Sequence, residues 1–170
     1  MRKSFVHLHA HTEYSMLDGA AKINDYLKKV KELNQPAAAI TDHGNLYGAL
    51  EFVRQAELQN IIPIIGYEAY VTPGSRFDRP ERDKNKRYHL TLLAENNIGY
   101  QNLVELVSKA YLEGFYYKPR VDYELLREHS EGIIALSGCL GGEVAQHLAP
   151  DGSREEGNTA NEKSFEKALE

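Results

Sequence analysis

The sequence predicts an α/β fold, because short apolar runs alternate along the chain with segments of helical periodicity. Five apolar runs are predicted to be strands, at residues 5–9, 37–41, 61–71, 89–94 and 133–136. Most of them are separated by segments in which apolar side chains recur every three or four residues. This alternation predicts parallel strands joined by helical crossovers.

The predicted helices follow the strands in order. Apolar positions at helical spacing predict a first helix over residues 23–33 and a second over residues 46–53. A polar loop, residues 72–87, follows the third strand, and a helix that carries residues 103–107 follows the fourth. Asp122 is the predicted N-cap of a short helix before the fifth strand.

Composition fits one globular domain. The 170 residues are 42% hydrophobic and 26% charged, with a net charge of −5. This charge argues against a generally basic nucleic-acid binder, although bound metal ions can supply local positive charge for a phosphate substrate. The single cysteine allows no internal disulfide, which fits a reducing cytoplasmic setting. The sequence has neither a secretory signal nor an apolar run of the ~20 residues that a membrane span needs, so no membrane association is predicted.

The last residues predict that 1–170 is the N-terminal portion of one domain, truncated at its C-terminus. Residues 159–162 match a capping box, and an apolar face begins at Phe165 shortly before the sequence stops at Glu170. A final helix that ends there is the alternative.

Side chains that can bind metal lie at the ends of four of the five predicted strands. His9 and His11 are separated by one residue, so both imidazoles point to the same side of an extended strand. The carboxyl ends of parallel strands meet at one rim of an α/β barrel, where active sites lie. That rim is predicted to gather His9, His11, Asp18, His43, Glu68 and Cys139. His89 is the exception, because it begins its apolar run rather than ending it.

The joint placement of these residues predicts a metal site. Each has a simpler reading alone: Asp42 and His43 can be turn chemistry, Glu68 a surface carboxylate, and Cys139 a small buried residue. Together, imidazole and carboxylate ligands suit zinc, manganese or iron better than calcium. Two or more such ions, about 3.5–4 Å apart, can hold the attacking and leaving oxygens of a phosphoester. They also lower the pKa of a water toward ~7, so no Ser or Cys nucleophile is required.

Three further segments leave their roles open. Residues 76–87 are rich in Lys and Arg, and they could contact a nucleic-acid backbone or form a solvated charged loop. Residues 114–120 are aromatic and basic, and they could stack on single strands or pack against a neighbouring domain. Gly141-Gly142 opens a helix whose N-terminus could bind phosphate.

Longer stretches of the sequence resemble a known family. His-Leu-His-Ala-His-Thr at residues 7–12, with Leu17-Asp18-Gly19, resembles the first motif of the polymerase-and-histidinol-phosphatase (PHP) family, and Thr41-Asp42-His43-Gly44 resembles the second. Further stretches are similar to the N-terminal PHP domain of bacterial DNA polymerase III alpha subunits, at residues 66–70, 89–94, 99–103, 108–111 and 134–139. The resemblance covers nearly the whole chain.

The resemblance implies a distorted, TIM-like, seven-stranded parallel α/β barrel of which about five βα units are present. It also implies up to three divalent metal ions, zinc or manganese. The matching ligands are His9, His11, Asp18, His43, Glu68, His89 and Cys139. Two further family ligands belong to an Asp-X-His motif that does not follow Cys139 here. His7 is expected to support a ligand rather than to bind metal.

For function, the resemblance implies part of a DNA-directed DNA polymerase of DNA replication, a nucleotidyltransferase whose polymerase carboxylates lie outside this chain. The local site implies metal-dependent phosphoesterase chemistry of a 3′–5′ exonuclease type. The implied partners are DNA, the remaining polymerase domains and, through them, the proofreading exonuclease subunit and the sliding clamp. The alternatives are a non-catalytic scaffold that docks the proofreading subunit, and a metallohydrolase similar to histidinol-phosphate phosphatase.

Overall fold

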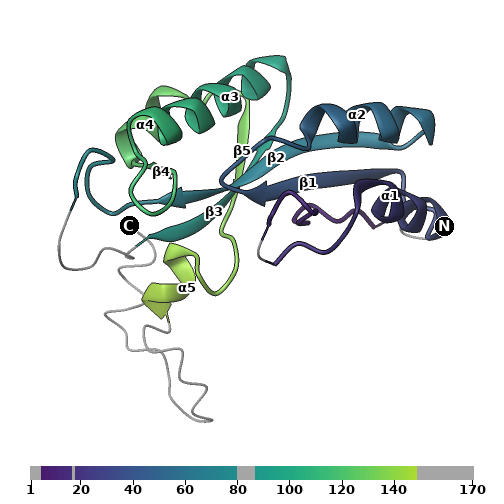
Figure 1. Cartoon of the computed structure of the whole chain (residues 1–170), viewed down its shortest axis with the longest axis horizontal. Coiled ribbons are helices and arrows are strands. Elements are labelled where there is room, and N and C mark those ends of the chain that lie inside the picture. Colours follow the sequence, from purple (N-terminus) through teal and green to yellow (C-terminus); the bar gives the residue numbers. More distant parts are fainter. Residues whose placement is uncertain (1–4, 17, 80–86, 149–170) are drawn as a thin grey trace, which may run out of the picture.

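The computed structural model describes residues 5–16, 18–79 and 87–148, which form a five-stranded sheet with helices packed on it (Figure 1). The predicted α/β class is confirmed. None of the helices in the described ranges is long and apolar enough to cross a membrane. The elements, in chain order, are α1 (Ile23–Glu32), β1 (Ala37–His43), α2 (Ala49–Leu58), β2 (Ile62–Val71), β3 (Tyr88–Ala94), α3 (Asn97–Leu112), β4 (Arg120–Val121), α4 (Tyr123–Glu128), β5 (Ile133–Leu136) and α5 (Glu143–Leu148).

The sheet is mixed rather than all parallel. β1 pairs in parallel with β2, and β4 pairs in parallel with the last two residues of β2, beyond the end of β1. β3 is antiparallel to β2, and β5 is antiparallel to β3. The alternation of strands and helices did not predict these reversals. They arise because the described part of the connection after β2, residues 72–79, contains turns and no helix, so the chain can return beside the strand it has just left.

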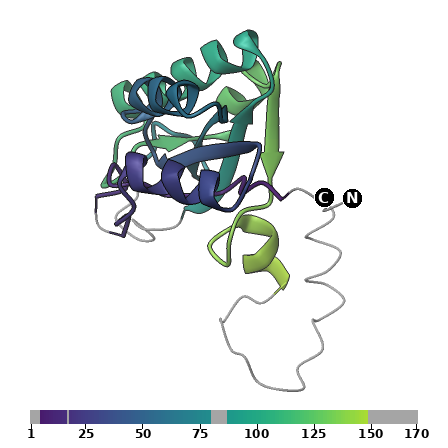
Figure 2. The same cartoon turned by 90° about the vertical axis from the view of Figure 1, so that its right-hand side faces the viewer.

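Three of the helices, α2, α3 and α4, cover one face of the sheet. α2, α3 and α4 lie above the strands in Figures 1 and 2, whereas α5 lies below them. Alternate residues of β2 point toward the helices, and Tyr67, Ala69 and Val71 share a core cluster with α3. A second cluster joins α1, α2 and β1. The intervening residues of β2, including Glu68, therefore point to the opposite face of the sheet.

The first predicted strand, residues 5–9, is not a strand in the structure. The segment nevertheless runs beside β1, because the amide of Ala39 donates to the carbonyl of His7 and the amide of Thr41 to that of Ala10. The amide of Ala10 donates to the Thr41 side chain, at 2.8 Å, rather than to a backbone carbonyl. The Thr41 hydroxyl thus takes the place of a backbone carbonyl as the acceptor of one hydrogen bond. The segment still lies beside β1, where a paired strand would lie.

Side chains cap the N-termini of two helices. Asp122 accepts a hydrogen bond from the amide of Leu125 at the start of α4, which confirms it as the N-cap. Asn96 caps α3 in the same way, through the amide of Gly99. The sequence did not predict β4, whose two residues are too few to show a periodic pattern. The helix predicted from Thr159 lies outside the described residues.

The charged loop after β2 has a structural role at its beginning. Arg76 is buried and bonds both carboxylate oxygens of Asp122, at 3.1 and 3.2 Å, and Glu113 at 2.6 Å. Arg79 donates to backbone carbonyls, including that of Glu113. These two arginines therefore tie the loop to α3 and α4 instead of offering their charge to a partner. Arg82, Lys84 and Lys86 lie outside the described residues.

We expect Arg76→Met to lower the free energy of unfolding by about 2–3 kcal/mol. Removing one partner of a buried ion pair costs ~3–5 kcal/mol, and the cost is smaller here because Glu113 is one-third exposed. Urea denaturation followed by circular dichroism measures the change. Arg127→Met, at an exposed position on α4, is the control and should change stability by less than about 0.5 kcal/mol. Equal stability of the two variants would contradict a structural role for Arg76.

Candidate metal centre

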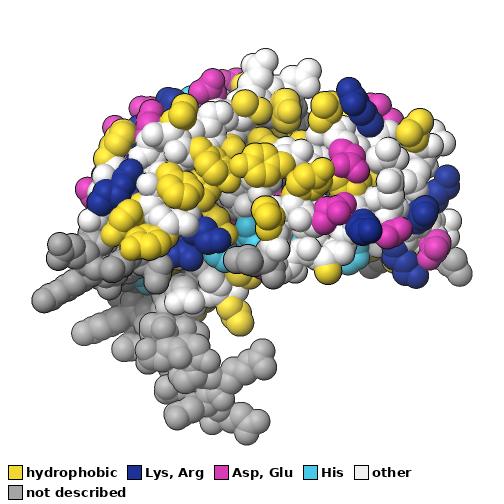
Figure 3. Space-filling view, viewed as in Figure 1, with side chains coloured by type: hydrophobic (Ala, Val, Ile, Leu, Met, Phe, Trp, Pro, Cys, Tyr) yellow, Lys and Arg dark blue, Asp and Glu magenta, His cyan; other side chains and the backbone are white. Residues whose placement is uncertain are grey.

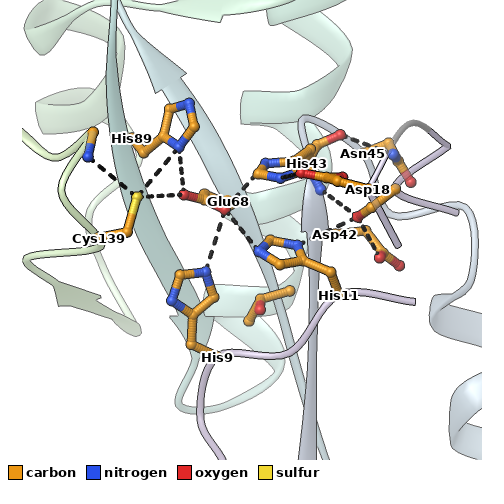
Figure 4. Close-up of polar contacts among 12 residues, drawn as sticks. His9, His11, Asp18, Asp42, His43, Asn45, Glu68, His89 and Cys139 are labelled. Carbon is orange, nitrogen blue, oxygen red and sulfur yellow. Dashed lines mark hydrogen bonds and ion pairs between the residues drawn. The ribbon is translucent and has the colours of Figure 1, made fainter. Parts of the chain in front are cut away.

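Four imidazoles surround the carboxylate of Glu68 (Figure 4). Glu68 is 1% exposed, and its Oε2 lies 3.2 Å from His9 Nε2, 3.0 Å from His11 Nε2 and 3.0 Å from His43 Nδ1. Its Oε1 lies 2.7 Å from His89 Nδ1. The reading of Glu68 as a surface carboxylate is therefore wrong, and this residue is the centre of the cluster.

Asp18 and Cys139 lie at opposite ends of the cluster. Asp18 Oδ2 is 2.9 Å from His43 Nε2, whereas Cys139 Sγ is 3.6 Å from His89 Nδ1 and 3.8 Å from Glu68 Oε1. The fold thus brings together all seven residues that the sequence analysis named, from six separate places in the chain. Asp18 and Cys139 are both exposed, so the cluster is open to solvent at each end.

The sheet topology explains why these residues meet. His43 ends β1 and lies opposite Glu68 in the parallel register. β3 runs antiparallel to β2, so its first residues lie beside the last residues of β2, and His89 is paired with Tyr70. β5 reverses again, which brings Cys139 to the same rim after the end of the strand. His89 was an exception only because all strands were expected to be parallel.

Contacts within the cluster shift the pKa values of Glu68 and His43. Burial alone would raise the pKa of Glu68, but its contacts with His11, His43, His89 and His9 outweigh burial and hold that pKa well below its ordinary range. The contact with Glu68 raises the pKa of His43, against the opposing effect of burial. Glu68 is therefore an anion, and it provides a buried negative charge around which the imidazoles are arranged.

A second, fully buried network supports the cluster. Asp42 is 1% exposed and accepts hydrogen bonds from the amide of Thr12 at 2.6 Å, from Thr12 Oγ1 at 2.7 Å and from Ser15 Oγ at 2.7 Å. Ser15 Oγ also accepts from the amide of His43 and contacts His11 Nδ1 at 3.3 Å. Asp42 thus anchors the loop that carries His11 to the end of β1.

Sequence reasoning missed the role of Asp42, which it had explained as turn chemistry. The available signal was its position next to His43 at a strand end, because adjacent strand residues point to opposite faces. A turn does follow at Gly44, whose φ of +64° is the left-handed conformation that glycine favours. Its amide donates to the carbonyl of Glu68 at 2.8 Å, so this turn fixes the end of β1 against β2.

Two other expectations do not fit the structure. His7 is exposed and its ring contacts Phe5, and no hydrogen bond or ion pair joins its side chain to the cluster within the described ranges. It was expected to support a ligand. The amides of Gly141 and Gly142 are used internally, by Cys139 Sγ and the Cys139 carbonyl, so they do not form a phosphate site.

Comparisons with known proteins agree with the motifs. The family described as "PHP domain" matches residues 7–170. The DNA polymerase III subunit alpha of Thermus aquaticus is 60% identical over 152 residues, which cover 86% of this chain and 12% of that protein. The same subunit of Deinococcus radiodurans is 56% identical over 154 residues, again 86% of this chain and 12% of that protein. The chain therefore spans about one-eighth of the length of these curated relatives.

Solved structures give a more distant match. An amidohydrolase from Chromobacterium violaceum aligns with a TM-score of 0.46 and 20% sequence identity. The aligned region covers 62% of this chain and 32% of that one.

Proposed function

This chain belongs to the PHP domain family, and on that premise we propose that it is part of the PHP domain of a DNA polymerase III alpha subunit and carries a metal-dependent phosphodiesterase site. The proposed reaction is hydrolysis of a phosphodiester at a DNA 3′ end. The observation that carries the proposal is the convergence of four imidazoles and a thiol on one buried carboxylate. We further propose that this sheet is part of the distorted barrel of the family.

The donor set of the cluster fits divalent transition metals. Neutral imidazoles and thiolates are ligands of zinc and related ions rather than of calcium or magnesium, which favours zinc, and the carboxylates of Glu68 and Asp18 are ligands that manganese also accepts. Two groups of residues have ligand atoms that all lie within 4.8 Å of one another, namely His9, His11 and Glu68, and His43, Glu68 and His89. Glu68 belongs to both groups, so it would help to hold an ion at either of them. Asp18 and Cys139 would complete the set at its ends.

The chain's own residues hold and orient this set. Divalent ions, when bound, supply positive charge that stabilises the negative charge developing on the phosphoryl oxygens. Ser15 fixes the orientation of His11 through its contact with Nδ1, which leaves Nε2 directed at Glu68. Asp18 does the same for His43, because its contact with Nε2 leaves Nδ1 directed at Glu68. The two exposed ends of the cluster give a substrate access to it.

The proposal is tested by metal analysis and hydrolysis of a single-stranded DNA 3′ end. We expect the purified chain to retain at least one equivalent of metal after dialysis, and to lose hydrolysis on treatment with a chelator. His43→Ala should lower both metal content and hydrolysis, the latter on the order of 10²-fold. His7→Ala is the control, because His7 lies in the same segment as His9 without contacting Glu68. Activity that survives both the chelator and His43→Ala would contradict the proposal.

The proposal extends to the setting of the domain. DNA, the remaining domains of the polymerase chain, the proofreading exonuclease subunit and the sliding clamp are the proposed partners, and the cytoplasm is the proposed compartment. Support for this comes from the similarity to the alpha subunits; the one from Treponema pallidum is 53% identical over 155 residues, which cover 91% of this chain and 13% of that protein.

A further inference from the structure

A cavity of about 420 Å³ opens beside the cluster, and its volume is in the range of small-molecule sites. One end of it is formed by Asp18, His43 and His89, which belong to the cluster. Most of the remaining lining residues are aromatic or cationic, and these are Tyr14, Tyr47, Tyr70, Arg87, Tyr111, Phe115, Tyr117 and Lys118. A molecule in this cavity would therefore touch the cluster and the aromatic side chains at once.

The aromatic side chains form a wall with exposed rings. We define the aromatic wall as Tyr47, Tyr111, Phe115 and Tyr117, which are 60%, 37%, 51% and 58% exposed. The rings of Tyr111 and Phe115 are stacked, with centroids 6.1 Å apart, and the ring of Tyr47 lies 6.4 Å from that of Tyr111. In Figure 3 a band of hydrophobic side chains crosses this side of the molecule and comes close to histidine and cationic side chains.

The backbone at Tyr117 is held in an unfavourable conformation. Its φ of +61° is left-handed, which is rare for an aromatic residue and costs about 1–3 kcal/mol. The amide of Tyr116 donates to the carbonyl of Lys118 and closes the turn around it. Strain of this kind is often found where a side chain must point into a functional site. Here it places an exposed ring on the lining of the cavity.

Positive charge lies between the aromatic wall and the cluster. Lys118 Nζ and the guanidinium carbon of Arg87 are each 5.5 Å from the centroid of the Tyr70 ring. That ring stacks on His43 at 6.0 Å and lies 5.3 Å from His89. The Tyr70 ring therefore separates the two cations from His43 and His89 of the cluster. Although the chain has a net charge of −5, positive charge is concentrated at this place, where an anionic group approaching the cluster would pass.

We propose that this cavity binds the terminal nucleotide of a single-stranded nucleic acid, with the base on the aromatic wall and its phosphate near Lys118 and Arg87. The inference rests on the proposed function and adds the side chains that would bind the terminal base and its phosphate. Aromatic faces bind bases of any identity by stacking, and cations follow the backbone, which together are the features of single-strand sites. A free phosphate would leave the aromatic wall without a binding partner. A peptide carries no phosphate that would account for the two cations beside the proposed metal site.

The test measures binding without hydrolysis. The probes are a fluorescent single-stranded DNA with a phosphorothioate at its terminal linkage, and the same strand without its terminal 3′ base. Fluorescence anisotropy of the full chain should give an affinity about ten-fold or more higher for the intact strand, because stacking of one base contributes ~1–3 kcal/mol. Lys118→Gln should weaken both probes alike and reduce the salt dependence of binding.

Variants of the aromatic wall test whether its rings cause the preference for the intact strand. Tyr117→Asn removes a ring while keeping a residue that tolerates positive φ, and Tyr111→Ala removes a second ring. Both should abolish the preference for the intact strand, whereas Tyr111→Phe should retain it. Tyr100→Ala is the matched control, since Tyr100 is an exposed tyrosine of α3 that does not line this cavity. Melting temperatures of the variants that match that of the unchanged chain would exclude misfolding as the cause.

Each result decides the inference separately from the proposed function. Equal binding of the two strands, or a preference that survives Tyr117→Asn and Tyr111→Ala, overturns the inference even if the chain hydrolyses DNA. A preference that those variants abolish supports it even if hydrolysis is absent, in which case only the proposed function fails. A concentration-dependent dimer that Tyr117→Asn disperses, without any preference for the base, would show instead that a second copy covers the aromatic wall.

Discussion

Glu68→Gln is expected to remove the bound metal and to lower DNA hydrolysis by about 10³-fold or more. Glutamine has the same shape as glutamate, but its amide nitrogen is a donor and cannot serve as a metal ligand. Glu68 is also the one residue shared by both groups of candidate ligands, so its loss affects each of them. Two ions held by these groups would stabilise the transition state together, so the loss of both should exceed the effect of replacing a single histidine.

The measurement pairs elemental analysis of dialysed protein with single-turnover hydrolysis. Glu57→Gln, an exposed glutamate of α2, makes the same chemical change away from the cluster and should leave both readouts unchanged. Melting curves recorded without metal separate a local effect from unfolding. Full metal content together with normal hydrolysis in Glu68→Gln would rule out Glu68 as the centre of the site.

The sequence predicted which side chains the fold brings together better than it predicted the directions of the strands. The strand positions followed from apolar runs, and β1, β2, β3 and β5 begin and end within two residues of those predictions. Strand direction did not follow, because it depends on whether the connection returns beside a strand or crosses over the sheet. The described part of the connection after β2, residues 72–79, contains turns, and the polar sequence of the connection is compatible with either course.

His89 illustrates the consequence. Its position at the start of an apolar run is inconsistent with a rim built only from the ends of parallel strands. Only the resemblance to PHP domains placed it among the ligands. The antiparallel pairing of β3 with β2 removes the inconsistency, since the start of one strand lies at the end of the other. A residue pattern can therefore point to a candidate ligand when the topology inferred from the same sequence does not account for it.

Asp42 illustrates a different limit. Its position next to His43 at a strand end indicates only that the two side chains point to opposite faces of the sheet. That position does not distinguish a buried acceptor from a residue that begins a turn, since Asp favours both roles. Its function depends on Thr12 and Ser15, which are about 30 residues away and reach it only when the loop folds back onto β1. Hydrogen-bond networks between segments that are distant in the sequence can be recognised only in the three-dimensional structure.

Asp42→Ala is expected to lower the free energy of unfolding by about 4 kcal/mol and metal affinity by ten-fold or more. The variant leaves the amide and hydroxyl of Thr12 and the hydroxyl of Ser15 without their acceptor in a buried place, and each hydrogen bond to a charged group contributes ~1.5–3 kcal/mol. Ser15 contacts His11 and His43, so its displacement loosens two candidate ligands.

Asp42→Asn separates the role of Asp42 in positioning ligands from a general loss of stability. Its Oδ1 can still accept from the amide of Thr12 and from Ser15, so metal affinity should return to within a few-fold of the original value. Thermal unfolding with and without zinc gives both quantities, since a metal that binds only the folded chain raises the melting temperature. Asp25→Ala, an exposed position on α1, is the control. If Asp42→Ala and Asp42→Asn lost metal affinity equally, Asp42 would act through its charge and not by positioning His11.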